Sequence, residues 1–379
     1  MSGKTPHQTG IYNNHTFLFD RLEPHEIWPS AFKKNGYFCS SGGKLYHSNN
    51  GMLPGAIHRA LYSDRRKRFN GDMRIPKELE MKSFGGHRKG WGTTNPKDDA
   101  TFYDHEAADS AISFLENYKG DAPFYREVGF FSPHGPHVTP ARFKELYDVD
   151  NFQMPSEWVE GFDENAYAMG YIQENKFLKD GDAAWWKRSI RNYFSAISHG
   201  DYHLGRVWDA LQASPHAQNT IVVILSDHGF HLGDRNLFCK TTLWETVARV
   251  PLIIHDPENP QGRDIEDPVA LLDVGPTILD MVGLSNADFD LAGQSLRPLL
   301  GGQPDPDRAV PTFLRNNAAI RKGDYRLIRY EDGSTQLYNI KKDMWQQHDL
   351  GRDDPAFTPM YHELISCCRS HGLDLGDAA

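Results

Sequence analysis

The most constraining feature of this chain is a short apolar run at residues 221–225, Ile-Val-Val-Ile-Leu, followed at once by Ser-Asp-His-Gly. A wholly apolar, β-branched run of this length is typical of a strand that is buried on both faces, as in a parallel sheet. In open α/β sheets, ligand sites form at the carboxyl ends of the strands. The sequence therefore predicts an α/β fold in which Asp227 and His228 lie at such a sheet edge.

A lysine and a second apolar run follow that edge. Lys240 begins the sequence Lys-Thr-Thr-Leu-Trp-Glu, and residues 249–254 read Arg-Val-Pro-Leu-Ile-Ile. A carboxylate, an imidazole and an ammonium group at one sheet edge suit a bound cation together with an anionic substrate. The simpler alternative is a surface loop after a core strand, where polar residues are ordinary. The position of the lysine before a second apolar run favours the ligand site.

Several further motifs occur in an order that resembles the type I sulfatases of the alkaline phosphatase superfamily, closest to the branch of iduronate-2-sulfatase and choline-sulfatase. Besides the stretch from Ser226 onward, the matching segments are Asn35–His47, Val128–His134, Asp273–Asp280 and the C-terminal hairpins. The resemblance implies a large, mainly parallel sheet sandwiched by helices, with a small C-terminal antiparallel sheet. It also implies metal-dependent hydrolysis of a sulfate ester.

One part of the family pattern is not found in the sequence. In the family, a Cys or Ser in C/S-x-P-x-R becomes formylglycine, the nucleophile, and no such motif occurs here. Residues 1–12 resemble the segment that follows this motif, and the family's opening strand with its paired metal-binding aspartates is not recognised either. The resemblance therefore implies a nucleophile upstream of Met1. We expect a preparation of this sequence alone to turn over aryl sulfates poorly or not at all.

The resemblance gives roles to basic residues in the matched motifs. Lys44 and Lys240 would contact the sulfate oxygens, and Lys240 would also lie near the leaving oxygen. His47 and His134 would attend the nucleophile and the ester oxygen, because an imidazole that titrates near neutrality suits a general acid or base. His137 is expected at the substrate-binding rim, where the family more often has an aromatic residue. Taken singly, each lysine could instead be a solvated surface charge.

The resemblance also makes Asp227 and His228 metal ligands. A carboxylate favours Ca²⁺, while the softer nitrogen of His228 leaves Mn²⁺ or Zn²⁺ open. The alternatives are an aspartate that caps a turn and a histidine that packs in a loop or core. His231 follows three residues after His228, but this spacing on a turn is only weak support for a second metal site.

Composition excludes some partners. The chain of 379 residues carries a formal charge of −10, which argues against a nucleic acid or an anionic membrane as the main partner. No apolar run approaches the roughly 18–20 residues of a membrane span. The expected partner is a small-molecule or saccharide sulfate ester, and the oligomeric state is open.

Four cysteines without a disulfide or CxxC pattern favour a reducing, cytoplasmic compartment, although a secreted or periplasmic location is not excluded.

The chain divides into an expected catalytic domain at residues 1–304 and a C-terminal subdomain at residues 305–379. Apolar spacing predicts helices near 104–118, 187–213 and 357–369, and Asp332-Gly333 predicts a hairpin turn. Residues 51–105 are expected to form loops over the pocket, and the aromatic-rich residues 150–187 an ordered excursion.

Two other functions fit the same residues. A phosphodiesterase or phosphonate monoester hydrolase of the same superfamily would use a similar cation and nucleophile on a tetrahedral anion. A degenerate, non-catalytic relative would keep only an anion-binding pocket. The Gly-Lys-x-x-His and Pro-His motifs at residues 43–47 and 133–134 favour the sulfate ester.

Overall fold

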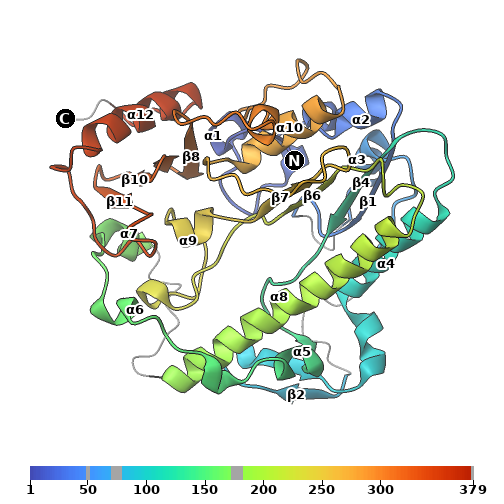
Figure 1. The fold of residues 1–379 in the computed structure, drawn as a ribbon, viewed down its shortest axis with the longest axis horizontal. Coiled ribbons are helices and arrows are strands. Elements are labelled where there is room, and N and C mark those ends of the chain that lie inside the picture. The colour runs from blue at the N-terminus through green and yellow to red at the C-terminus, as the bar shows by residue number, and fades with distance from the viewer. Residues whose placement is uncertain (48–51, 70–78, 172–181, 377–379) are drawn as a thin grey trace.

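The computed structural model describes residues 1–47, 52–69, 79–171 and 182–376, which form an α/β fold (Figure 1). Its central parallel pair consists of β1 (Phe38–Gly43) and β4 (Phe124–Gly129), paired from Phe38 with Phe124 to Gly43 with Gly129. At the carboxyl end the backbones approach closely, since a Cβ on Gly43, which has φ 86°, would lie 2.0 Å from the Gly129 carbonyl oxygen. This approach sets Lys44 at the edge, where its amide donates to that oxygen at 2.8 Å.

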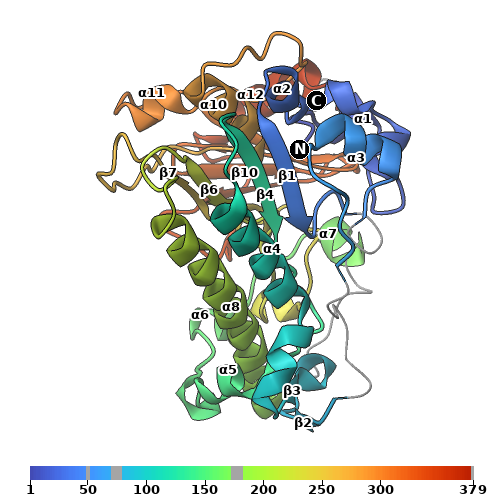
Figure 2. The same cartoon turned by 90° about the vertical axis from the view of Figure 1, so that its right-hand side faces the viewer.

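Two long helices, α4 (Tyr103–Asn117) and α8 (Ala183–Gln212), lie side by side (Figure 2). Helix α4 packs on β1 and β4, and buries Ala107, Ala108 and Ala111. The predicted helices near 104–118 and 187–213 are confirmed, with the second beginning four residues earlier than expected.

The strand before Asp-His-Gly differs from its prediction. It is β6 (Val222–Leu225), and it pairs antiparallel with β7 (Leu252–His255). Its residues are half-buried rather than buried, and Leu225 is 44% exposed. The prediction of a parallel strand buried on both faces was wrong because β6 has one paired neighbour among the described residues, and no hydrogen-bonded pairing in that part of the chain joins it to β4.

The C-terminal sheet is antiparallel in the order β11-β10-β9-β8, as the resemblance implied. It comprises β8 (Ala309–Leu314), β9 (Asn317–Lys322), β10 (Tyr325–Arg329) and β11 (Thr335–Asn339), and α12 (Phe357–Ser370) packs on it. The predicted hairpin and closing helix are confirmed. Buried Arg326 joins this sheet to the main body by donating to the Leu243 carbonyl at 2.7 Å and pairing with Glu245 at 3.1 Å.

Shorter elements surround this frame. The helices are α1 (Pro6–Thr9), α2 (Ser30–Lys34), α3 (Gly55–Leu61), α5 (Ala141–Glu145), α6 (Glu157–Glu160), α7 (Ala166–Tyr171), α9 (Glu245–Ala248), α10 (Val274–Met281) and α11 (Arg297–Leu300). A small sheet has the order β2-β3-β5, from Met81–Ser83, Trp91–Thr93 and Thr139–Pro140. The 3₁₀ turns are η1 (Leu18–Asp20), η2 (Pro24–Glu26), η4 (His87–Gly90), η5 (Pro96–Thr101), η6 (Val149–Asn151), η8 (Asp234–Asn236) and η9 (Leu271–Asp273).

These elements modify two expectations. Residues 51–105 hold short helices and strands as well as loops, apart from residues 70–78, which lie outside the described part. The expected ordered excursion at 150–187 contains α6 and α7, while its residues 172–181 are likewise not described. Within the described ranges, no helix is long and apolar enough to cross a membrane.

Candidate active site

Charged side chains from four segments converge at the carboxyl ends of β1, β4 and β6. Lys44 follows β1, His134 lies in the loop after β4, His228 follows β6, and Lys240 lies between β6 and β7. Burial lowers the pKa of His134, and the nearby Lys44, Lys240 and His228 lower it further. The structure therefore brings four of the predicted site residues into one electrostatic neighbourhood.

The ammonium group of Lys240 lies against His228. Its Nζ donates to Nε2 of His228 at 2.7 Å, while Nδ1 of that ring lies 2.8 Å from the Gly229 carbonyl oxygen. Because a carbonyl can only accept, Nδ1 carries the proton and Nε2 is the free acceptor. Burial lowers the pKa of Lys240, the Asp227 carboxylate raises it, and the Lys44 charge lowers it further.

His134 is held as a neutral imidazole. Burial lowers its pKa to about 4, and the charge of Lys44 adds to this effect. Its Nδ1 donates to the Gly135 carbonyl at 2.7 Å, so Nε2 has no proton and can accept one. At neutral pH, His134 is thus a hydrogen-bond acceptor or base beside two ammonium groups.

The segment after β1 takes an unusual backbone conformation. Tyr46 and His47 have φ of 57° and 48°, a left-handed region that side-chain-bearing residues rarely adopt. Nζ of Lys44 lies 5.5 Å from the ring centre of Phe131 in the loop after β4. His47 is exposed, and no contact within the described residues joins it to the other predicted site residues.

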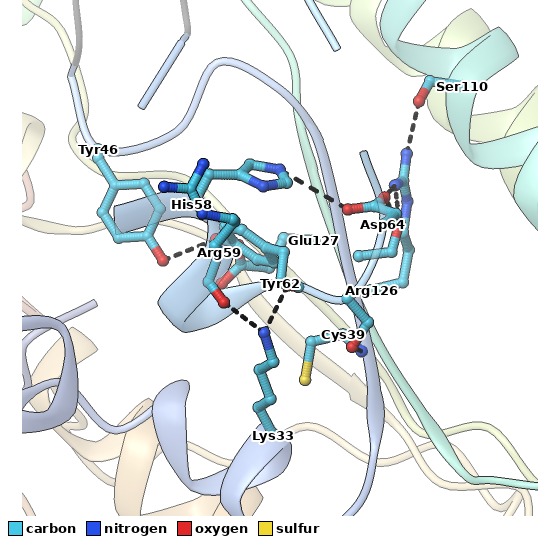
Figure 3. Close-up of polar contacts among 12 residues, drawn as sticks. Lys33, Cys39, Tyr46, His58, Arg59, Tyr62, Asp64, Ser110, Arg126 and Glu127 are labelled. Atoms are coloured by element: carbon cyan, nitrogen blue, oxygen red, sulfur yellow. Dashed lines mark hydrogen bonds and ion pairs between the residues drawn. The ribbon is translucent and has the colours of Figure 1, made fainter. Parts of the chain in front are cut away.

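A buried carboxylate holds this left-handed segment through two phenols (Figure 3). The hydroxyls of Tyr46 and Tyr62 are 2.8 Å apart, Tyr62 donates to Glu127, and Tyr125 also donates to Glu127 at 2.7 Å. Burial raises the pKa of Glu127, while the two donated hydrogen bonds oppose that rise. Since Tyr62 gives its proton to Glu127, its oxygen accepts from Tyr46.

A second polar network adjoins the first (Figure 3). Ser40 donates to Asp64 at 2.6 Å, Arg126 donates to Ser40 and to Ser110 at 2.8 Å, and His58 lies 3.7 Å from Asp64. Neither network was predicted from the sequence. The feature that could have indicated them is the ionisable pair Arg126-Glu127 in the middle of an otherwise aromatic and apolar strand.

The loop that carries His134 is held by a different buried carboxylate. Asp104 of α4 accepts hydrogen bonds from the backbone amides of Phe131 and Ser132, the latter at 2.9 Å. The Ser132 hydroxyl lies 3.3 Å from Nδ1 of His199, whose Nε2 lies 3.1 Å from Nε2 of His203. Asp104 and both of these histidines are buried.

The sequence predicted His137 at the rim of the site, but the structure places it below the loop. It is 4% exposed, beneath the loop and beside the rings of His87 and Tyr193. Buried Lys144 donates to its carbonyl oxygen at 2.9 Å, and burial lowers the pKa of the His137 ring to about 3. Helices α5 and α8 cover this end of the loop, so His137 supports the loop from below.

His231 is a structural residue in the segment before Lys240. Its ring is 0% exposed, with Nδ1 2.6 Å from Asp234 and Nε2 2.8 Å from the Thr242 hydroxyl. Both ring nitrogens are engaged, so they provide no free ligand for the second metal site that its spacing suggested. The contact instead fixes Thr242, two residues after Lys240.

Asp227 and His228 provide donors suited to a divalent cation. The Asp227 side chain is 76% exposed, and Oδ1 lies 3.7 Å from Nε2 of His228. Among the residues that the structure describes, no group of three or more His, Cys, Asp or Glu is placed to hold a metal. The donor chemistry fits a hard or borderline cation, but this pair supplies only part of a coordination sphere.

Comparisons with known proteins show which proteins this chain is similar to. A model of the sulfatase family matches residues 1–284, and one described as N-sulphoglucosamine sulphohydrolase, C-terminal, matches residues 233–368. A sulfatase of Formosa agariphila is 33% identical over 361 residues, which are 90% of this chain and 70% of the relative.

Solved structures show the same fold at lower identity. A protein solved with its substrate D-glucosamine-2-N,6-O-disulfate has a TM-score of 0.69 at 18% identity, over 98% of this chain and 85% of that one. The phosphonate monoester hydrolase of Agrobacterium radiobacter has a TM-score of 0.73 at 19% identity, over 98% and 84%. The predicted α/β fold with a parallel sheet and a small C-terminal antiparallel sheet is confirmed.

Proposed function

The chain belongs to the sulfatase family, and we propose that it hydrolyses sulfate esters at a site built around Lys44, His134 and Lys240. The observation that carries the proposal is the convergence of two ammonium groups on a neutral imidazole. A sulfate monoester spreads one negative charge over three oxygens, and loss of the alcohol builds charge on the bridging oxygen. Fixed cations beside both positions stabilise that charge distribution.

The proposed roles follow from the local environments. Lys44 and Lys240 bind the sulfate oxygens, and Lys240 delivers a proton to the departing alcohol, for which its lowered pKa is suited. The unprotonated Nε2 of His134 can accept a hydrogen bond from one of the two ammonium groups and so orient that group towards the ester. His47 is assigned to the same edge by its motif alone. The reaction also needs a nucleophile of the formylglycine type, a role that the proposal gives to no residue of the printed sequence.

We propose Asp227 and His228 as two ligands of a divalent cation, most consistent with Ca²⁺. When bound, such a cation neutralises charge on the sulfate oxygens. Lys240 now occupies Nε2 of His228, so binding would free this ammonium for the substrate. Calcium should raise the melting temperature of the wild type and raise it less for Asp227→Asn. An identical shift in both proteins would remove Asp227 from the metal site.

The expected substrate is a small-molecule or saccharide sulfate ester, since one structural neighbour was solved with a sulfated glucosamine. Phosphonate monoester hydrolysis is the second candidate, because such a hydrolase shares the fold. A third is anion binding without turnover, in which the cationic edge holds the anion but no nucleophile attacks it. Both alternatives use the same cationic edge.

A matched ester panel distinguishes these functions. Binding of p-nitrophenyl sulfate, p-nitrophenyl phosphate and p-nitrophenyl phenylphosphonate would be compared for the wild type, Lys240→Ala and the exposed-lysine control Lys97→Ala. Their hydrolysis would be compared in versions of the same three proteins that also carry the nucleophile segment of the family. We expect preference for the sulfate, and a kcat about 10²–10³ lower in Lys240→Ala alone, as for loss of one transition-state donor. Preference for the phosphonate, or binding without turnover, would establish an alternative. A near-normal kcat in Lys240→Ala would remove Lys240 from the site.

A further inference from the structure

We propose that the turn at residues 85–90 forms a second anion subsite, in which Arg88 binds a carboxylate or sulfate group carried by the same substrate as the scissile ester. This inference rests on the proposed function and narrows its substrate class. This turn, Gly-Gly-His-Arg-Lys-Gly, lies among the loops that were expected over the pocket, and no family motif gives a role to its side chains.

The turn keeps two basic residues in an unfavourable backbone conformation. Arg88 and Lys89 have φ of 50° and 64°, in the left-handed region, between glycines that also have positive φ. Residues with a Cβ pay for this geometry in steric strain, and they keep it only where surrounding contacts determine it. Glycine would fit both positions without strain, which makes the two basic side chains candidates for a functional role.

The surrounding contacts clamp the turn onto α8. The amide of His87 donates to the Ser189 hydroxyl at 2.7 Å, and the Asn192 amide group donates to the Gly85 carbonyl at 2.7 Å. Gly90 is pressed against the same helix, since a Cβ there would lie 2.1 Å from the Asn192 side chain. The turn is therefore a fixed platform for the two basic side chains.

His87 of this platform lies beside two segments of the candidate active site, the loop of His134 and the segment before Lys240. Its ring lies 6.1 Å from the ring of His137, beneath the His134 loop, and 5.9 Å from the ring of Phe238, two residues before Lys240. Burial lowers the pKa of His87 to about 4, and the charge of Arg88 contributes to this. Residues 85–90 thus hold a constant position relative to the proposed sulfate site.

The guanidinium of Arg88 lies across the loop that carries His134. A Cβ built on Gly135 would lie 3.6 Å from Nη1 of Arg88, and the same Gly135 accepts the hydrogen bond from His134. Arg88 is exposed, and no ion pair joins it to a carboxylate in the described ranges. An exposed guanidinium beside Gly135, the residue after His134, is suited to bidentate binding of a carboxylate or sulfate.

The consequence is a preference for esters with two anionic groups. A substrate that places a second sulfate or a carboxylate beside the scissile sulfate would engage Arg88, whereas a simple aryl sulfate would leave it in water. The chain as a whole carries a formal charge of −10, so a polyanion needs local cations of this kind to approach the site.

The test compares glucosamine 6-O-sulfate with glucosamine 2-N,6-O-disulfate as ligands of the full chain. Arg88→Gly removes the guanidinium and suits the left-handed backbone, and Lys89→Gly is the matched control with the same loss of charge and the same backbone geometry. We expect the wild type to bind the disulfate about 10-fold more tightly, and Arg88→Gly to lose that preference. Lys89→Gly should retain it, and both variants should melt close to the wild type.

The outcomes separate the two proposals. If the wild type binds the monosulfate, and Arg88→Gly leaves the disulfate preference unchanged, the subsite is overturned while the sulfate site stands. The subsite is also overturned if Arg88→Gly weakens binding of the monosulfate and the disulfate equally, because Arg88 would then not distinguish the second anionic group. It is overturned as well if Lys89→Gly loses the disulfate preference as fully as Arg88→Gly, because any positive charge on the turn would then have the same effect. If the wild type binds neither ligand, the proposed function itself fails, and the subsite fails with it.

Discussion

Two segments of the candidate site are held by buried carboxylates, but in different ways. The left-handed turn at Tyr46 and His47 is tied to Glu127 through the hydroxyl of Tyr62. The loop of His134 is held directly, because Asp104 accepts two backbone hydrogen bonds at its start. Removal of the Tyr62 hydroxyl would break the first connection but leave the backbone hydrogen bonds intact. Removal of the Asp104 carboxylate would leave two backbone amides without an acceptor. The His134 loop should therefore be the more sensitive of the two.

The largest effect is expected from Asp104→Ala. It leaves two amides of the His134 loop without an acceptor, which should cost about 3 kcal/mol of unfolding free energy and lower kcat about 100-fold through misplacement of the loop. Asp109→Ala is the control on the same helix, since Asp109 makes half-exposed ion pairs with Arg206 and His105. Denaturant unfolding of the chain measures the first effect, and ester kinetics of a version that carries the family's nucleophile segment measure the second. Equal effects of the two substitutions would refute the anchoring role of Asp104.

The two segments should also differ in how their stability responds to pH. Burial lowers the pKa values of His137, His199 and His203 to about 3, all beneath the His134 loop. These rings stay neutral when folded but become protonated when unfolded below about pH 6.5, so their contribution to stability is full above that pH and falls as the pH drops towards 3. Glu127 has a raised pKa, so acidification does not weaken its contribution.

Hydrogen exchange at pH 7, 6 and 5, corrected for the intrinsic rate, measures this contrast. The protection of residues 131–140 should fall by about tenfold or more between pH 7 and 5. The protection of residues 44–47 should change much less over the same range. A uniform loss in both segments would contradict the separate anchoring of the two loops.

The smallest effect is expected from Tyr62→Phe, which cuts the tether between Tyr46 and Glu127. The variant loses the hydrogen bonds of this hydroxyl to Tyr46 and to Glu127, each worth about 1 kcal/mol, and should lower kcat roughly fivefold. Tyr125→Phe is the control, because Tyr125 also donates to Glu127 but makes no hydrogen bond to Tyr46 among the described residues. Both variants should lose stability, and only Tyr62→Phe should lose activity. A kcat loss in both variants would show that Glu127 acts through the fold as a whole.

The sequence predicted the parts of the site that depend on local order along the chain. The strand-end position placed Asp227 and His228 at a sheet edge, and the family resemblance added Lys44, His134 and Lys240. The structure groups Lys44, His228 and Lys240 around His134. Periodicity and turn residues also predicted the long helices and the C-terminal hairpin. These features are set by neighbours within a few residues, which sequence patterns record directly.

The parts that the sequence did not predict depend on distant packing. Glu127 meets Tyr62 across 65 residues, and no local pattern encodes that contact. His137 was expected at the rim because the family more often has an aromatic residue there, but α5 and α8 bury it. The apolar run of β6 predicted burial on both faces, yet burial depends on which elements cover a strand, and Leu225 is 44% exposed.

The most direct test of the account is a structure with bound p-nitrophenyl sulfate, determined for a variant or condition that does not turn it over. If Lys44 and Lys240 have the proposed roles, the sulfate oxygens will lie within hydrogen-bonding distance of both ammonium groups, with the bridging oxygen towards Lys240. A competing location is the nearby cavity lined by His58, Arg66 and Lys67. Density for the ester in that cavity, with Lys240 still bonded to His228, would contradict the proposed site.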